Sequence, residues 1–373
     1  MYDPATAPDL LSSPAVTAGP DYLSSPEALA RALAGLGAAD RVLLATQALR
    51  VGSLDYAAAI CESAAGEVEP ALRLTHAAAL FGLGEHARAI ALVDGVLLEQ
   101  PEHLAAQFYR AQMAQHAGDV ARATRLLLGV LERFPDFPGA HGALASLRMP
   151  GPPYRDVLRR VHELLRPATY LEIGVETGAT LAFAQGAQRA IGIDPDASKL
   201  RRELVPACAR VFHETSDAFF AGHSREQLLG SARLDLAFID GMHLFEFALR
   251  DFMHVEAWSN PSACVVLHDC VPLLPLSASR ERRTKFWVGD VWKVVSILRE
   301  YRPDLRVKIV ATAPSGLCVV RGLNPSSRVL HDELDAIVEQ YRDMPYPVGA
   351  LETPVGFELV PASDAGLREA LVA

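Results

Sequence analysis

Carboxylate and histidine side chains follow two apolar runs near the middle of the chain. Asp240 ends LDLAFID and Asp269 ends ACVVLHD, and His243 and His268 lie close to them in the sequence. If the two runs are neighbouring strands, their carboxylates need a cation or a proton between them, because bare like charges raise each other's pKa. A histidine has an intrinsic pKa suited to taking or giving a proton. The pattern therefore indicates cation binding or acid–base chemistry.

A glycine turn lies upstream of these residues. The chain reads YLEIGVETGAT at 170–180 and then IGID, which ends in Asp194, 20 residues after Gly174. Gly174 and Gly178 permit backbone conformations closed to other residues, and a helix beginning near Gly178 would direct its N-terminal amides into the same crevice. Asp194 is placed to accept hydrogen bonds from ribose hydroxyls. Glu172 would repel a pyrophosphate, which argues against a dinucleotide.

The elements that must position these residues are short strands alternating with helical segments. This order predicts an α/β fold with a mostly parallel, seven-stranded Rossmann-like sheet, helices on both faces and ligands at the carboxyl ends of the strands. Any one polar strand end is more simply the first solvated loop position, but five in succession favour a site. The last two strands are separated by a Pro-Ser turn and predict a closing hairpin. Beyond the two strands of the glycine motif, the expected strands cover 208–213, 234–240, 263–269, 307–312 and 316–322.

The first part of the chain contains an internal repeat. Glycines at 52, 84 and 118 are each followed five residues later by alanine, and prolines at 70, 101 and 135 close the units. A helix-turn-helix period of 34 residues is typical of tetratricopeptide repeats. The repeat predicts an all-α domain that either binds a protein partner or a second copy of the chain, or only supports the following domain.

Length and composition predict several domains in a soluble protein. The expected divisions are a flexible leader (1–25), helical repeats (26–150), an α/β domain (151–322) and a C-terminal extension (323–373). The net charge of −10 argues against nucleic acid, and no apolar run is long enough to span a membrane. Five scattered cysteines predict free thiols in the cytoplasm.

The E-x-G-x-x-x-G pattern resembles the first motif of class I methyltransferases that use S-adenosylmethionine (SAM). The resemblance implies that Glu172 and the turn from Gly174 to Gly178 hold the methionine part of SAM and that Asp194 holds the ribose. The resemblance also places Thr215, Ser216 and Asp217 where relatives contact the adenine, although these residues also suit the N-cap of a helix.

Two further segments, FIDGMHLFEFALRDF (238–252) and VVLHDC (265–270), resemble the metal-dependent branch of SAM O-methyltransferases, which includes enzymes acting on sugars of macrolides. The resemblance implies that Asp240 and Asp269 bind a metal. His268, where relatives often carry an acid, either ligates the metal or borders the site. Mg²⁺ suits oxygen ligands, and imidazole ligation would favour Mn²⁺ or Fe²⁺. His243 is then a candidate general base, or else a histidine at a helix start facing solvent.

A long loop precedes the helix near residue 292, and such loops often contribute to binding sites. Its Trp287, and Trp292 beyond it, could stack on a sugar or aromatic ring, while Arg282, Arg283 and Lys285 could meet an acidic substrate. The alternative is that Trp292 belongs to the core and the arginines are solvated.

The sequence thus predicts a SAM-dependent O-methyltransferase, metal-assisted, acting on a hydroxyl of a sugar or glycosylated natural product. We expect a small-molecule acceptor and a homo-oligomer. The alternatives are a metal-independent methyltransferase, a hydroxylase-type relative that kept the fold, and a repeat-based binding protein whose second domain binds SAM without catalysis.

Overall fold

The structure is a computed structural model. It describes residues 33, 35–63, 69–347 and 358–372, so the leader predicted for residues 1–25 lies outside the described residues. The chain divides between Leu147 and Arg148 into two compact units, and each is described by itself.

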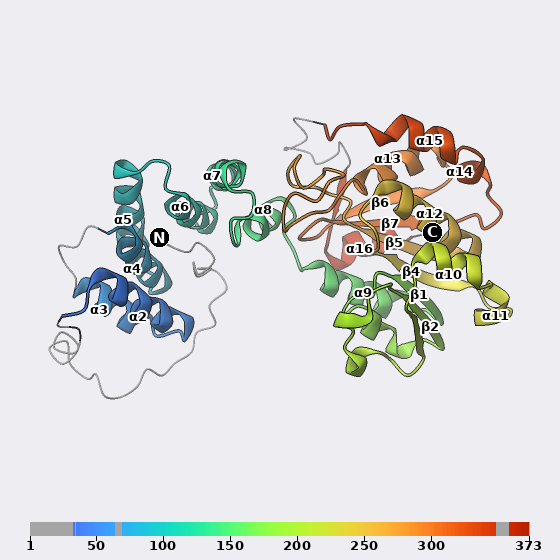
Figure 1. The fold of residues 1–373 in the computed structure, drawn as a ribbon, viewed down its shortest axis with the longest axis horizontal. Helices are drawn as coiled ribbons and strands as arrows, with labels where there is room; N and C mark the ends of the chain where they lie inside the picture. Colours follow the sequence, from blue (N-terminus) through green and yellow to red (C-terminus); the bar gives the residue numbers. More distant parts are fainter. Residues whose placement is uncertain (1–32, 34, 64–68, 348–357, 373) are drawn as a thin grey trace. The chain divides into compact units, whose positions relative to one another are not determined.

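The first unit is built from antiparallel helical hairpins (Figure 1). The glycines at 52, 84 and 118 have φ between +77° and +84° and form the turns inside the hairpins. The alanines at 57, 89 and 123 are fully buried, which allows the paired helices to approach closely. The predicted repeat is therefore confirmed. Its helices are α2 (Ala38–Arg50), α3 (Leu54–Glu62), α4 (Pro70–Gly82), α5 (His86–Glu99), α6 (Leu104–His116), α7 (Val120–Arg133) and α8 (Ala140–Arg148).

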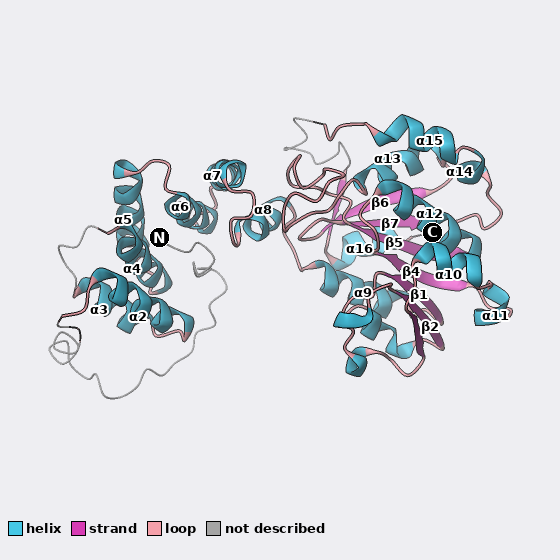
Figure 2. Ribbon diagram, in the orientation of Figure 1, coloured by secondary structure: helices cyan, strands magenta, loops and turns pink. Residues whose placement is uncertain are grey.

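The second unit contains one twisted sheet (Figure 2). Its order among the described residues is β3-β2-β1-β4-β5-β7-β6-β8, and β7 runs antiparallel to both of its neighbours while the other pairs are parallel. All seven predicted strands are present. The strands are β1 (Thr169–Ile173), β2 (Arg189–Ile193), β3 (Ala209–Phe212), β4 (Leu234–Ile239), β5 (Ser259–His268), β6 (Arg306–Ala311), β7 (Leu317–Arg321) and β8 (Leu359–Pro361).

Helices cover both faces of this sheet, as predicted. Helices α9 (Tyr154–Leu165) and α16 (Asp364–Leu371) share one core cluster with the side chains of one face. Helix α12 (Phe245–Trp258) packs on β4 and β5 at the other face and contacts α10 (Ser216–Gly222) and α13 (Trp292–Tyr301). Shorter helices complete the unit: α11 (Arg225–Leu229), α14 (Val329–Asp332), α15 (Leu334–Arg342), η3 (Ala197–Lys199) and η4 (Arg202–Leu204).

Two details differ from the prediction. The α-helix expected near Gly178 is instead a 3₁₀ helix, η2 (Leu181–Gly186), because few residues separate Gly178 from β2 and a tighter helix spans them. The sheet also has an eighth strand, β8, which pairs with β6 and belongs to the predicted C-terminal extension. Its three residues carry too little pattern to be recognised in the sequence.

In the described part of the chain, every helix is too short or too polar to cross a membrane.

Candidate active site

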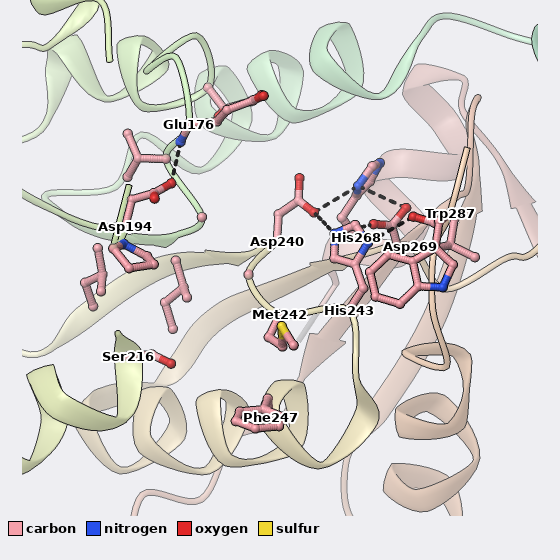
Figure 3. A pocket seen from close by; sticks show the side chains of 18 of the residues that line it. Glu176, Asp194, Ser216, Asp240, Met242, His243, Phe247, His268, Asp269 and Trp287 are labelled. Atoms are coloured by element: carbon pink, nitrogen blue, oxygen red, sulfur yellow. Dashed lines mark hydrogen bonds and ion pairs between the residues drawn. The ribbon is translucent and has the colours of Figure 1, made fainter. Parts of the chain in front are cut away.

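A cavity of about 850 Å³ opens at the carboxyl ends of β1, β2, β4 and β5. This is the edge at which open α/β sheets bind ligands. Figure 3 shows side chains from separate elements directed towards one space, with Asp194 at one end and the cluster of Asp240, His243, His268 and Asp269 at the other. The start of α9 and the loop between β5 and α13 (residues 269–291, here the β5–α13 loop) also contribute to the lining.

The glycine turn lies against the end of β4. Gly174 has φ +88°, and a Cβ built there would lie 1.9 Å from the carbonyl oxygen of Asp240. Glycine is therefore required at 174 by the neighbouring strand itself. Gly178 has φ +83° and donates its N–H to the carbonyl of Val175, but only Gly174 of the two lines the cavity.

Glu172 lies inside the protein and outside the cavity lining. Its carboxyl group accepts hydrogen bonds from the Tyr170 hydroxyl at 2.6 Å and the Thr180 hydroxyl at 2.8 Å. Burial raises its pKa to about 8, against the lowering effect of these two hydrogen bonds. Glu172 thus connects β1 to the segment after the glycine turn through buried hydrogen bonds. Its side chain does not line the cavity.

Asp194 does line the cavity, and it also shapes the turn. One carboxylate oxygen accepts the backbone N–H of Glu176 at 2.7 Å, and the other accepts that of Asp196 at 2.8 Å. Each oxygen keeps a second lone pair for a ligand hydroxyl. Glu176 has φ +45° and lines the same cavity, and its carboxylate pairs with Lys199 at 3.1 Å.

The segment 215–217 caps a helix, as predicted, and lies at the cavity, while its contact with adenine stays a prediction. Thr215 is the N-cap of α10, because its hydroxyl accepts the N–H of Ala218. The three residues also line the cavity, and Asp217 is held by an ion pair with Arg250 at 2.8 Å.

Asp240, His243 and Asp269 converge at the other end of the cavity. Each offers one ligand atom, and these atoms lie within 4.8 Å of one another. Nε2 of His243 is 3.1 Å from Oδ2 of Asp269 and 3.6 Å from Oδ1 of Asp240. Asp269 has φ +60°, so its side chain leaves the end of β5 in a direction that ordinary strand geometry would not allow.

The ring of His243 is held by the β5–α13 loop. Its Nδ1 lies 3.1 Å from the carbonyl oxygen of Trp287, and the two rings stack with centroids 5.3 Å apart. A carbonyl can only accept, so Nδ1 carries the proton and Nε2 faces the carboxylates. The loop can approach this closely because residue 289 is glycine: a Cβ there would lie 1.7 Å from the His243 carbonyl oxygen.

His268 faces the same two carboxylates from the buried side. Its Nδ1 is 3.3 Å from Asp240 and 3.4 Å from Asp269, and its Nε2 is 3.3 Å from the hydroxyl of Ser315. That hydroxyl donates to Asp269 at 2.6 Å, so it can accept from Nε2. The Tyr154 ring lies over His268 with centroids 4.2 Å apart. Each histidine therefore hydrogen-bonds a group outside the carboxylate pair through one ring nitrogen and directs the other nitrogen at the two carboxylates.

Charge in this cluster is strongly coupled. Burial alone would raise the pKa of Asp240 and lower the pKa of both histidines. The opposite charges prevail: the histidines hold the pKa of Asp240 well below its usual range, and the carboxylates raise the pKa of His243 and, further still, that of His268. In the absence of a cation, the cluster therefore favours the protonated form of the imidazole rings beside the carboxylates.

The contributors to the site that were not predicted include Tyr154, Glu176 and Ser315. Tyr154 comes from the first residue of α9, far from the motifs in sequence. Ser315 is the serine of the Pro-Ser turn before β7, which was recognised only as a hairpin turn. Glu176 lies within the glycine motif itself, and its acidic character between Gly174 and Gly178 was the available signal.

Comparisons with known proteins identify both units. Residues 171–270 match the family model described as a methyltransferase domain, and residues 80–147 match that of a tetratricopeptide repeat. No curated protein matches the chain. The second unit therefore contains a methyltransferase domain at residues 171–270, and the first contains tetratricopeptide repeats at residues 80–147, as predicted.

Several solved structures are similar to part of the chain. The O-methyltransferase TomG from Streptomyces achromogenes, involved in tomaymycin synthesis and solved with SAM, is 18% identical, with a TM-score of 0.37 over 46% of this chain and 80% of its own. An O-methyltransferase from Bacillus cereus is 13% identical, with a TM-score of 0.35 over 48% of this chain and 87% of its own. The N-methyltransferase NodS from Bradyrhizobium japonicum is 17% identical, with a TM-score of 0.31 over 46% and 93%.

Proposed function

We propose that this methyltransferase domain transfers the methyl group of SAM to a hydroxyl of a sugar or glycosylated natural product, with a divalent metal at the carboxylate cluster. The observation that carries the proposal is the single cavity that joins a glycine turn and Asp194 at one end to Asp240, His243, His268 and Asp269 at the other. A donor bound at the first end would direct its reactive group towards a hydroxyl held at the second.

The residues proposed for SAM divide into two groups. Asp194 would accept the ribose hydroxyls, Gly174 would let the backbone approach the methionine part, and residues 215–217 would border the adenine. Glu172 and Gly178 would act on the cofactor only through the turn, since neither lines the cavity.

The carboxylate cluster fits a divalent cation by the chemistry of its donors. Metal-bound histidines donate their outer N–H to a carbonyl or a similar acceptor. His243 does this to Trp287, and His268 is placed to do it to Ser315. Two carboxylates with imidazole suit Mn²⁺ as well as Mg²⁺. Such a cation would lower the pKa of an acceptor hydroxyl and orient it.

We assign metal binding to Asp240, Asp269 and His268, and proton removal to His243. The His243 side chain is 27% exposed and that of His268 is 7% exposed, so an acceptor hydroxyl reaches His243 more easily. The Trp287 carbonyl fixes one proton of His243 on Nδ1, so that Nε2 would be free to take a proton once a cation neutralises the carboxylates. Asp269 would then stabilise the imidazolium that forms. Nε2 also lies close enough to the carboxylates for the two histidines to exchange these roles.

Binding of S-adenosylhomocysteine (SAH) to the full chain, measured by calorimetry with and without Mn²⁺ or Mg²⁺, tests the proposal. We expect SAH to bind and the metal to bind independently at the cluster. Absence of SAH binding would contradict every function that requires SAM, whether catalytic or not. SAH binding with methyl transfer that survives EDTA would support the metal-independent alternative, in which the imidazolium rings neutralise the carboxylates.

All five cysteines are free thiols, which favours a reducing compartment such as the cytoplasm. The helical repeats would supply a surface for a protein partner or for a homo-oligomer.

A further inference from the structure

Four cations lie at the tip of the β5–α13 loop, and they are not equivalent. Arg280 pairs with Glu246 at 2.5 Å and Asp290 at 2.7 Å, and Arg283 pairs with Glu281 at 2.6 Å. Arg282 and Lys285 both line the cavity. The guanidinium of Arg282 donates to the carbonyl of Lys285 at 3.4 Å, and no carboxylate of the described residues lies within ion-pair distance of it.

The carboxylates that line the cavity are already engaged elsewhere. Asp194 accepts two backbone N–H groups, Glu176 pairs with Lys199, and Asp217 pairs with Arg250. Asp240 and Asp269 are held by the two histidines and Ser315. The exposed guanidinium of Arg282 therefore remains available to a group that enters the cavity.

The loop that presents these cations is anchored at its base. Nε1 of Trp287 donates a hydrogen bond to the carbonyl of Ser279 at 2.7 Å. The backbone N–H of Val288 donates to the carbonyl of Ser277 at 3.1 Å. Asp290 is almost fully buried, binds Lys293 at 2.9 Å and accepts the N–H of Phe245 at 2.9 Å. The same segment holds His243, so the loop tip is fixed relative to the carboxylate cluster.

We propose that the acceptor carries an anionic group, a carboxylate or a phosphate, which Arg282 binds with the help of Lys285 while the acceptor hydroxyl lies at Asp240 and Asp269. The inference rests on the proposed function and defines the substrate class of that site. A guanidinium matches both anions because its N–H groups can donate to two oxygens at once. Trp287 and Phe286 supply apolar surface between the two ends of such a molecule.

Calorimetry on the full chain, saturated with SAH and free of divalent metal, tests this with inorganic phosphate and malonate as probes. Wild type should bind at least one of them, and Arg282→Ala should weaken that binding by about tenfold, as expected for one charge-assisted hydrogen bond. Arg283→Ala, which removes a neighbouring cation already paired with Glu281, should leave it unchanged. The tighter of the two probes distinguishes a phosphate from a carboxylate acceptor.

Equal anion binding by wild type and Arg282→Ala would overturn the inference, and so would the absence of anion binding by wild type. Weaker SAH binding by Arg282→Ala would also overturn it, because Arg282 would then belong to the cofactor. Failure of wild type to bind SAH would count against the proposed function itself.

Discussion

Nε2 of His243 lies 3.1 Å from Oδ2 of Asp269, although His243 belongs to the loop after β4 and Asp269 follows β5. Such a contact between a neutral imidazole and a carboxylate is unfavourable, because both atoms are then acceptors. It requires a proton on Nε2 or a cation between the two groups. Metal binding and proton binding therefore compete at this cluster, and the first predictions depend on that competition.

Removing either central carboxylate should abolish metal binding. Asp240→Asn and Asp269→Asn each replace a charged ligand by a neutral one, and we expect Mn²⁺ affinity and methyl transfer to fall by about 100-fold or more, beyond the usual effect of a supporting residue. Calorimetric Mn²⁺ titration measures this. Asp217→Asn is the matched control for Mn²⁺ affinity alone, because its carboxylate lines the cavity but pairs with Arg250. Unchanged Mn²⁺ affinity in both variants would exclude a metal at the cluster.

Substitution of the two histidines should have different effects on Mn²⁺ affinity and on kcat. His268→Gln should weaken Mn²⁺ binding by roughly tenfold or more, as loss of a ligand or of its closest support does. His243→Gln should retain Mn²⁺ and lose about 100-fold or more in kcat, the contribution typical of a general base. Metal titration and steady-state kinetics on both variants measure the split. The reverse pattern would show that His243 is the ligand.

Gly174→Ala should damage the site through its backbone. The added Cβ would lie 1.9 Å from the Asp240 carbonyl oxygen, and φ is +88°, so we expect a loss of about 2–4 kcal/mol in the free energy of unfolding together with loss of SAH binding. Gly186→Ala is the control, since no atom lies within 4 Å of the position of its Cβ. Chemical denaturation measures both variants. Equal stability of the two variants would show that the turn can move away from the Asp240 carbonyl and accommodate the added Cβ.

Stability should depend on the protonation of Glu172. Burial raises its pKa from 4.5 to about 8, so the folded state holds the proton more tightly than the unfolded chain does. Its favourable contribution is complete below pH 4.5 and is lost as the pH rises towards 8. Glu172→Gln, which cannot ionise, should lose less stability than wild type over this interval. Denaturation at a series of pH values measures the difference, and parallel curves would contradict the buried protonated carboxyl group.

The sequence predicted the parts of this site that depend on local pattern. The apolar runs that end in Asp194, Asp240 and Asp269 are the parallel strands β2, β4 and β5. Parallel strands bring their carboxyl ends to one edge of the sheet, so the three carboxylates line one cavity. The helical repeat could also be predicted from its glycines and alanines, because each of them has a conformational or packing role within its own hairpin.

Contacts between distant segments could not be predicted in this way. Tyr154 reaches His268, and Trp287 reaches His243, only after helix α9 and the β5–α13 loop have packed on the sheet. The placement of Glu172 was also missed. Side chains two residues apart in a strand share a face, so its pairing with Tyr170 was available from the strand period.

SAH binding to the full chain compared with Asp194→Ala tests the central claim most directly. The account predicts that wild type binds SAH and that the variant binds it about 10- to 100-fold more weakly, the effect of losing hydrogen bonds to a charged acceptor. Equal affinity of the two proteins, or no binding by wild type, would contradict a SAM site in this cavity.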